Sequence, residues 1–263
     1  MSMQYSMLEL SFAGHVATVT LNRPDVRNAF NETTIAELTD AFRQLETRDD
    51  VRAIVLAANG PAFCAGADLN WMKKMATFSD EENRVDARRL ADMLSAIYRS
   101  SKPVVARVSG DAYAGGVGLV AASDIVVAVE SARFCLSEAR LGLIAATIAP
   151  YVVRALGERA SRRYFVTAEP FDCATAQRVG LVHERVAPDA LDETIKRITA
   201  ALCANGPHAV RESKRLVQDV AGETIDEALI DDTARRIARI RASEEGREGV
   251  ASFLEKRAPN WRD

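Results

Sequence analysis

Hydrophobic residues form short, strand-like runs separated by longer helical patterns through the first two thirds of the chain. Runs rich in β-branched and apolar residues predict strands at residues 16–21, 51–58, 104–108 and 125–129. Between them, apolar residues recur at intervals of three and four over 33–45, and a charged segment with one apolar face covers 81–98. Both patterns predict helices. The alternation of strands and helices predicts an α/β fold.

The last third of the chain has a different pattern. Asp172 and Gly180 are placed to cap the two ends of a short helix, and a last short strand is predicted at 181–186. Beyond it only helices are predicted, over residues 191–204, 209–220, 225–242 and 246–256. We therefore divide the chain into a core, residues 1–195, and a C-terminal helical region, residues 196–263.

The C-terminal helices carry apolar stripes that a single layer of helices cannot bury. The stripes contain Leu229, Ile230, Ile237 and Ile240. Because an apolar helix face needs a partner surface, we expect another surface to cover these helices.

Composition describes an ordinary globular protein and excludes several classes. Of the 263 residues, 48% are apolar and 27% are charged, and the formal net charge of −3 gives no reason to expect nucleic acid or an anionic membrane as a partner. The segment 1–12 lacks the pattern of a secretory leader, and the longest apolar stretch, 112–122, is too short to span a bilayer. The four widely spaced cysteines form no C-x-x-C pair, which argues against a metal site and predicts reduced thiols in a cytoplasmic protein.

Two glycine-containing segments could expose backbone amides to a ligand. The first, 63–69, contains only small residues between Phe63 and Asp68, although a tight connection capped by Asp68 would look the same. The second, 110–118, is a glycine-rich turn that opens a helix after a predicted strand. Such a turn suits an anion, either a phosphate or a developing oxyanion. Close helix packing through the glycines is the alternative.

A third segment, 134–142, places the carboxylate of Glu138 among apolar and small residues. If the side chain is buried, its pKa rises and it can carry protons in catalysis. The alternative is a structural ion pair with Arg133 or Arg140.

A nucleotide-binding alternative also exists. Residues 116–121 match G-x-G-x-x-A, and Glu130 closes a following strand, as in a dinucleotide site. The glycines lie well past the strand at 104–108 rather than in a tight turn, which argues against this interpretation.

The three segments in this order, with Leu21-Asn22-Arg23-Pro24 and Asn28-Ala29 before them, resemble the crotonase (enoyl-CoA hydratase/isomerase) superfamily. The resemblance covers roughly residues 8–263. It implies a spiral of β-β-α units with a C-terminal helical trimerisation region, assembled as a homotrimer or a dimer of trimers. It also implies an acyl-CoA thioester substrate, with coenzyme A as part of that substrate and no other cofactor.

The resemblance assigns roles to individual residues. The backbone amides of Ala67 and Gly115 would hold the thioester oxygen, and Glu138 would move the proton. The positions that contact coenzyme A in the family fall here on Val26, Arg27, Ala29, Ala65, Asp68, Leu69 and Gly116. Phe253 and Lys256 match positions that complete the coenzyme A site of a neighbouring subunit.

One departure from the family pattern affects the expected reaction. A hydratase with two carboxylates carries the first glutamate in the helix after the glycines, and this position is Gly118 here. This departure argues against the two-glutamate mechanism, for which Asp111, Tyr113 or Ser137 would have to compensate. The expected reaction is addition or removal of water at an α,β-unsaturated acyl-CoA, with two alternatives: an isomerase using Glu138 alone, or a non-catalytic CoA-thioester-binding homologue. Thioester hydrolysis or decarboxylation is a further option. The segments 71–75 and 134–150 look most like methylglutaconyl-CoA or carboxygeranoyl-CoA hydratases, which act in leucine and acyclic-terpene breakdown.

Overall fold

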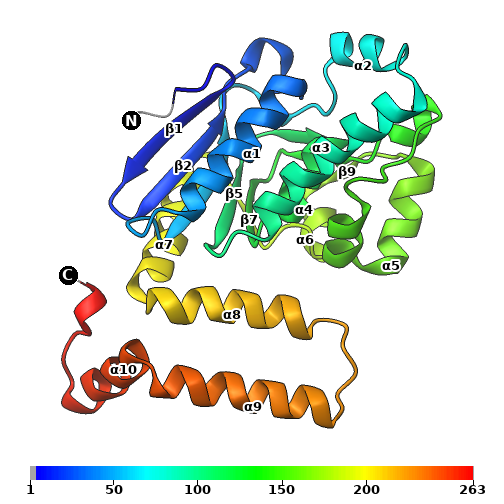
Figure 1. Ribbon diagram of the computed structural model, residues 1–263. Helices are drawn as coiled ribbons and strands as arrows, with labels where there is room; N and C mark the ends of the chain where they lie inside the picture. The colour runs from blue at the N-terminus through cyan, green and yellow to red at the C-terminus, as the bar shows by residue number, and fades with distance from the viewer. Residues whose placement is uncertain (1–3, 263) are drawn as a thin grey trace.

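A large, mostly parallel sheet forms the centre of the molecule in a computed structural model, which describes residues 4–262 (Figure 1). Met1 to Met3, part of the segment inspected for a leader, and Asp263 lie outside the described residues. The strand order is β1-β2-β3-β5-β7-β10, and only β1 runs antiparallel to its neighbour. The strands are β1 (Leu8–Ala13), β2 (Val16–Leu21), β3 (Ala53–Ala58), β5 (Val104–Val108), β7 (Ile125–Val129) and β10 (Glu184–Val186).

A second, smaller sheet receives the chain after β3, β5 and β7 of the first. It has the order β4-β6-β8-β9, with β4 (Ala62–Cys64), β6 (Asp111–Tyr113), β8 (Arg133–Cys135) and β9 (Phe171–Asp172). The pairs β3–β4, β5–β6 and β7–β8 are each followed by helical structure, so the β-β-α unit repeats three times. This confirms the predicted fold class. The short strands of this sheet were not predicted, because runs of two or three residues show no periodicity.

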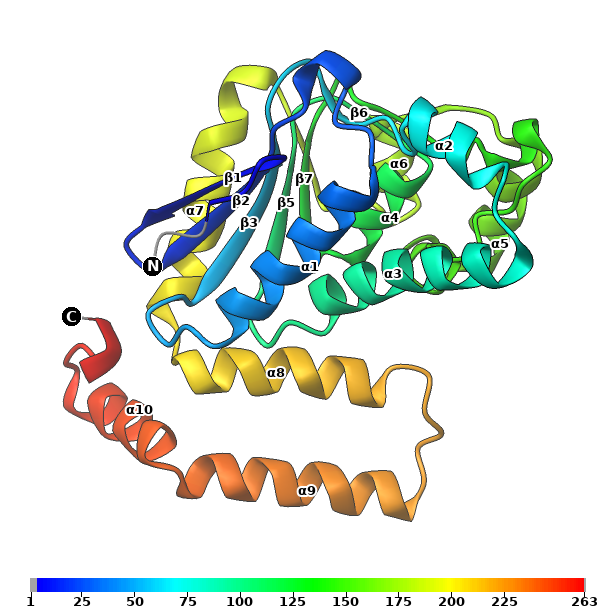
Figure 2. The same cartoon turned by 45° about the horizontal axis from the view of Figure 1, so that its top comes forward.

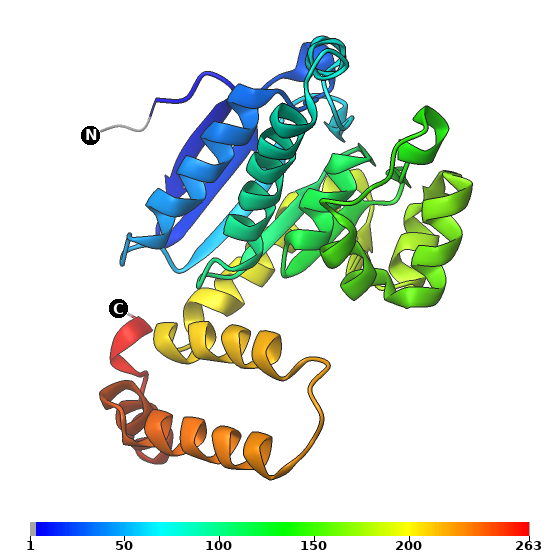
Figure 3. The same cartoon turned by 45° about the vertical axis from the view of Figure 1, so that its right-hand side comes forward.

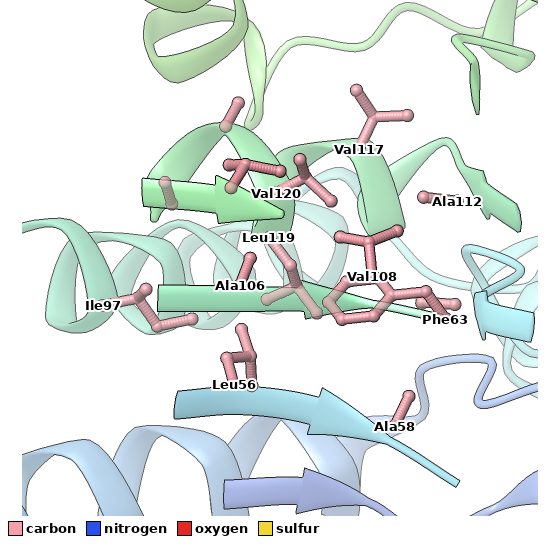
Figure 4. Close-up of a cluster of buried hydrophobic side chains, with 14 of the residues drawn as sticks. Leu56, Ala58, Phe63, Ile97, Ala106, Val108, Ala112, Val117, Leu119 and Val120 are labelled. Carbon is pink, nitrogen blue, oxygen red and sulfur yellow. The ribbon is translucent and has the colours of Figure 1, made fainter. Parts of the chain in front are cut away.

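Helices cover both faces of the large sheet, which explains the continuous apolar runs in its strands (Figure 2). On one face lie α1 (Glu32–Glu46), α3 (Asp80–Tyr98) and α4 (Gly115–Ala122), and on the other lies α7 (Leu191–Ala204). Leu56, Ala106 and Leu119 meet between the sheet and α4 and are fully buried (Figure 4). The remaining helices of the core are α2 (Leu69–Met75), α5 (Ala149–Thr167) and α6 (Cys173–Arg178).

The predicted caps of the short helix are confirmed. The Asp172 side chain accepts a hydrogen bond from the Thr175 amide at 2.8 Å at the start of α6. Gly180 follows the end of α6 with φ +91°, a left-handed conformation that favours glycine. The strand predicted over 181–186 is shorter than expected, because only Glu184–Val186 pairs with β7.

The C-terminal helices form a separate layer beside the core (Figures 1 and 3). They are α8 (Pro207–Val220), α9 (Glu227–Ala242) and α10 (Glu244–Glu255). Residue 195 lies inside α7, which packs on the large sheet, and the chain leaves that sheet at Asn205 and Gly206. Neither α8 nor α9 contains a fully buried residue within the described part of the chain, and Ile230 and Ile237 of α9 are 52% and 48% exposed.

Polar contacts from two residues attach α8 to the core. Lys214 Nζ lies 2.6 Å from Asp124 Oδ2 and donates to the Lys102 carbonyl at 3.1 Å. Gln218 donates to the backbone oxygen of Tyr98 at 2.7 Å. Across residues 4–262, none of the helices has the length and apolar character needed to cross a membrane.

Candidate active site

The two glycine-containing loops lie in direct contact, although 48 positions separate Ala67 from Gly115. A Cβ atom added to Gly66 would lie 2.9 Å from Ala114 Cβ, and one added to Gly116 would lie 2.5 Å from the Cys64 carbonyl oxygen. Real Cβ atoms essentially never approach other heavy atoms within 3.0 Å. Glycine at these two positions therefore permits the contact between the loops.

Phe30 holds the first loop in the orientation of a parallel strand. Its amide donates to the Gly66 carbonyl at 2.7 Å, and its carbonyl accepts from the Asp68 amide at 2.7 Å. The amide of the intervening residue, Ala67, has no acceptor among the described residues. This N–H is therefore available to a ligand.

The amide of Gly115 is also without an acceptor in the part of the chain that the structure describes. Gly115 is the first residue of α4, where amides have no partner within the helix. A Cβ here would lie 2.7 Å from the Phe30 ring, so Phe30 packs against both amide-bearing loops. The free amides of Ala67 and Gly115, on two touching loops, form a candidate oxyanion site.

Ala114 adopts an unusual backbone conformation just before Gly115. Its φ of 47° and ψ of −118° are costly for a residue with a side chain. Its amide donates to the Cys135 carbonyl at 2.8 Å, which helps to hold the turn. Strained residues of this kind concentrate at functional sites.

Glu138 begins a short 3₁₀ helix, Glu138–Leu141, three residues after Cys135, which pairs with Tyr113 beside the glycine turn. Its Oε2 atom is buried and has no hydrogen-bond partner within residues 4–262. Burial raises the pKa of this carboxyl group. A partly desolvated carboxylate with a free oxygen is suited to accept and return a proton.

The ion-pair alternative for Glu138 is wrong. The Arg140 guanidinium instead donates to the Ala168 carbonyl at 2.6 Å, and the Arg133 side chain is exposed on β8. No ion pair to Glu138 occurs in the described chain. The main chain at Glu138 is held by the Leu143 amide, which donates to the Glu138 carbonyl at 3.1 Å.

The place of a second carboxylate is filled by an apolar side chain. A Cβ on Gly118 would lie 2.9 Å from Ile148 Cβ, closer still to Ile148 Cγ2, and 3.6 Å from Leu94 Cδ2. Asp111, a possible replacement on β6, uses its Oδ1 to accept from the Arg133 amide at 2.9 Å.

The dinucleotide interpretation of residues 116–121 is not supported by the geometry. These residues lie inside α4 rather than in a turn between a strand and a helix. They therefore cannot form the phosphate-binding turn that this motif requires.

Several candidate contacts for coenzyme A lie around the first loop. Val26 and Arg27 are exposed, and the Arg27 carbonyl accepts from the Ala65 amide at 2.9 Å, so the two segments are adjacent. Leu69 is 73% exposed at the start of α2, whereas Ala29 is buried. The structure thus places the backbone of Arg27 beside the amide-bearing loop, with Val26 next to it in the chain and Leu69 at the end of the loop.

Asp68 has a structural role for its side chain. Its Oδ2 lies 2.9 Å from an Arg23 nitrogen, and its Oδ1 accepts from the Asn70 amide at 2.8 Å, which caps α2. Burial alone would raise its pKa, but Arg23 and the amides of Asn70 and Trp71 bring it below the usual value. The Asp68 carboxylate is therefore committed to orienting the loop and α2.

Phe253 and Lys256 lie on α10, at the opposite end of the molecule from α2 (Figures 1 and 2). Phe253 is 82% exposed, and Lys256 ends the helix in a left-handed conformation. The structure does not bring them to the site of their own chain. A role in binding coenzyme A would require a second copy.

Three residues of the site were not predicted individually from the sequence. Phe30 supports both loops, Ala114 sets the turn before Gly115, and Ile148 fills the space at Gly118. Phe30 directly follows the Asn28-Ala29 motif, which was the available signal. The other two depend on contacts between distant segments.

Comparison with known proteins agrees with this geometry. The enoyl-CoA hydratase/isomerase family matches residues 11–263. The fold superimposes on an enoyl-CoA hydratase from Shewanella pealeana with a TM-score of 0.95 and 43% identity, covering 98% of this chain and 97% of that one. A mevalonyl-coenzyme A hydratase from Aspergillus fumigatus is 34% identical over 94% of this chain and 92% of its own. A short-chain-enoyl-CoA hydratase from Clostridium acetobutylicum is 30% identical, with 97% of each covered. The chain belongs to the enoyl-CoA hydratase/isomerase family of enzymes.

Proposed function

We propose that the protein adds water reversibly to an α,β-unsaturated acyl-CoA thioester, with Glu138 as its acid/base. The observation that carries the proposal is the buried Oε2 of Glu138, which has no hydrogen-bond partner in the described chain and follows a strand, β8, that pairs with β6 just before Gly115. The hydratase names of several relatives support the same reaction class.

The reaction follows from these groups. The amides of Ala67 and Gly115 hold the thioester oxygen and stabilise its negative charge. Glu138 takes a proton from water as the water oxygen bonds to the β-carbon, and the C=C electrons move to form the enolate. The α-carbon then takes a proton from Glu138, which restores the carboxylate and the thioester carbonyl.

A panel of acyl-CoA thioesters followed by mass spectrometry tests this proposal. A mass gain of one water identifies a hydratase. Release of free coenzyme A would identify a hydrolase instead, and tight binding without turnover would identify a non-catalytic homologue. Either of these two results contradicts the proposal.

Isomerisation is the second candidate, and the filled position at Gly118 favours it. A single carboxylate can move a proton between two carbons of one enolate without positioning water. In the same panel, an isomerase leaves the mass unchanged and shifts the double bond.

For the substrate we propose an acyl group with a distal carboxylate, such as 3-methylglutaconyl. The support is the resemblance of segments 71–75 and 134–150, together with nearby cations. Four cations are candidates for binding this carboxylate: Lys73, Lys74, Arg140 and Arg154. Lys74 pairs with Glu32 at 2.5 Å, and Arg140 and Arg154 donate to the carbonyls of Ala168 and Pro150. Lys73, exposed on α2, is therefore the candidate that we favour. A kcat/KM for crotonyl-CoA equal to or above that for 3-methylglutaconyl-CoA would refute this preference.

The proposed assembly is a homotrimer or a dimer of trimers. The exposed apolar residues of α8 to α10 support it, because they lack a cover within the described chain. All four cysteines are free, which suits the reducing cytoplasm that we propose as its location.

A further inference from the structure

The helix that follows the oxyanion site has no group able to handle a proton. The eight residues of α4, Gly115–Ala122, are glycine, alanine, valine and leucine only. Gly118 lies one turn beyond Gly115, and residues three apart share a face of a helix. A carboxylate projecting from α4 at Gly118 would thus stand one turn from the free amide of Gly115.

Ile148 occupies the space into which that side chain would project. It is 2% exposed, and its Cβ and Cγ2 both lie within 3.0 Å of the Cβ position of Gly118. Leu94 Cδ2, 3.6 Å away, closes the same space from α3. Ile148 can therefore occupy this space only because residue 118 has no side chain.

We infer that Gly118 and Ile148 are a coupled pair that determines the reaction: Ile148 closes the place of a second carboxylate and leaves Glu138 to make every proton transfer. This inference rests on the proposed hydratase function for its chemical part. Two carboxylates of the nearby loops already have partners: Asp68 pairs with Arg23, and Asp111 accepts a hydrogen bond from the Arg133 amide. Glu138 would then both activate the water and protonate the α-carbon, so both steps would occur on the same side of the substrate.

The packing half of the inference is tested by thermal unfolding. Alanine is normally more stable than glycine inside a helix, yet Gly118→Ala should lower Tm by roughly 4–10 °C because its methyl overlaps Ile148. Gly118→Ala should not lower Tm when Ile148 is replaced by glycine, because the overlapping side chain is then absent. Glycine is a suitable replacement because residue 148 is the N-cap of α5, a position that glycine tolerates. Ile148→Val is the matched control: it keeps Cβ and Cγ2, so Gly118→Ala should remain destabilising beside it. A Tm penalty that is independent of residue 148 would overturn the pairing.

The chemical half is tested by building the second carboxylate. Gly118→Glu combined with Ile148→Gly should hydrate an enoyl-CoA about 10²-fold faster than Gly118→Gln combined with Ile148→Gly, which has the same shape without the charge. Its pH profile of kcat/KM should also gain a second carboxylate ionisation that the wild-type profile lacks. Equal rates and equal profiles in the two folded double variants would show that this place does not face the reacting atoms, and would overturn the inference.

The two proposals fail in different ways. A wild-type enzyme that only isomerises contradicts the hydratase function, while the pair is still tested by whether Gly118→Glu with Ile148→Gly acquires hydration. A wild-type enzyme that hydrates, with two carboxylate ionisations already in its profile, supports the hydratase function and overturns the single-carboxylate inference.

Discussion

Glu138 is the residue on which the chemistry depends most directly. Glu138→Gln keeps the size of the side chain and removes its ability to carry a proton, so turnover should fall by about 10²–10⁴. The variant should still bind a CoA thioester and should stop exchanging the α-proton with deuterated solvent. Turnover and exchange that both persist would assign the proton transfer to another group.

The same substitution should make the fold more stable near neutral pH. Burial raises the pKa of Glu138, so the unfolded chain releases this proton at a lower pH than the folded chain does. Stability therefore falls as the pH rises from the ordinary glutamate pKa to the raised one, and the loss is complete above it. Glu138→Gln should raise Tm by a few degrees at pH 8, and this gain should vanish below the ordinary glutamate pKa. A gain that persists at acidic pH would show that ionisation is not its cause.

Arg27 is exposed beside the amide-bearing loop, and its guanidinium group could bind a phosphate of coenzyme A. Arg27→Ala should raise KM for the thioester more than it lowers kcat, because the contact is made equally before and during the reaction. Arg27 has a left-handed backbone with φ 53°. The energetic cost of this conformation is similar for arginine and alanine, so the substitution should not affect folding. Arg27→Lys, which keeps the charge, should have an intermediate KM. A fall in kcat at constant KM would place Arg27 outside the binding site.

At the scale of elements, the sequence predicted the strands and helices that are defined by a local hydrophobic pattern. The strands at 16–21, 104–108 and 125–129 and the helices at 33–45 and 81–98 are present, because both periodicity and apolar runs are local signals. The small sheet escaped prediction because its strands are pairs or triplets of residues held by neighbours far along the chain. The Ile148–Gly118 contact escaped for the same reason, since it joins α4 to the start of α5.

A largely buried ion pair is one of the polar contacts that attach α8 to the core. Burial raises the pKa of Asp124 and lowers that of Lys214, so each charge needs the other across their 2.6 Å contact. Lys214→Met should lower the free energy of unfolding by about 3 kcal/mol, because it leaves Asp124 unpaired. Combining it with Asp124→Asn should recover part of the loss, since the amide oxygen can still accept from Val104.

Chemical denaturation measures both Lys214 variants, and hydrogen exchange in α8 shows whether the helix has detached. Lys196→Met, on the exposed side of α7, is the control and should change stability by less than about 0.5 kcal/mol. An equal loss in the single and double variants would mean that the ion pair is not what holds α8.

At the scale of the whole molecule, the C-terminal layer is the part that a single chain leaves incomplete. Ile230 and Ile237 are about half exposed on α9, and Val217 on α8 is 65% exposed. Burying such side chains contributes about 1.5–3 kcal/mol each, which an assembly of several copies would gain. We expect the wild-type protein to sediment as a trimer or hexamer at micromolar concentration.

Replacing both Ile230 and Ile237 with lysine should shift this equilibrium to smaller species, because each lysine would have to bury a charge in the interface. Arg241→Ala, at the exposed end of the same helix, is the matched control and should leave the assembly intact.

If Phe253 and Lys256 complete the coenzyme A site of a neighbour, the dissociated variant should also show a raised KM. Its α-proton exchange at saturating thioester should persist, because Glu138, Ala67 and Gly115 all belong to one chain. A wild-type protein that sediments as a monomer would contradict the proposed assembly and, with it, any role of α10 in the site.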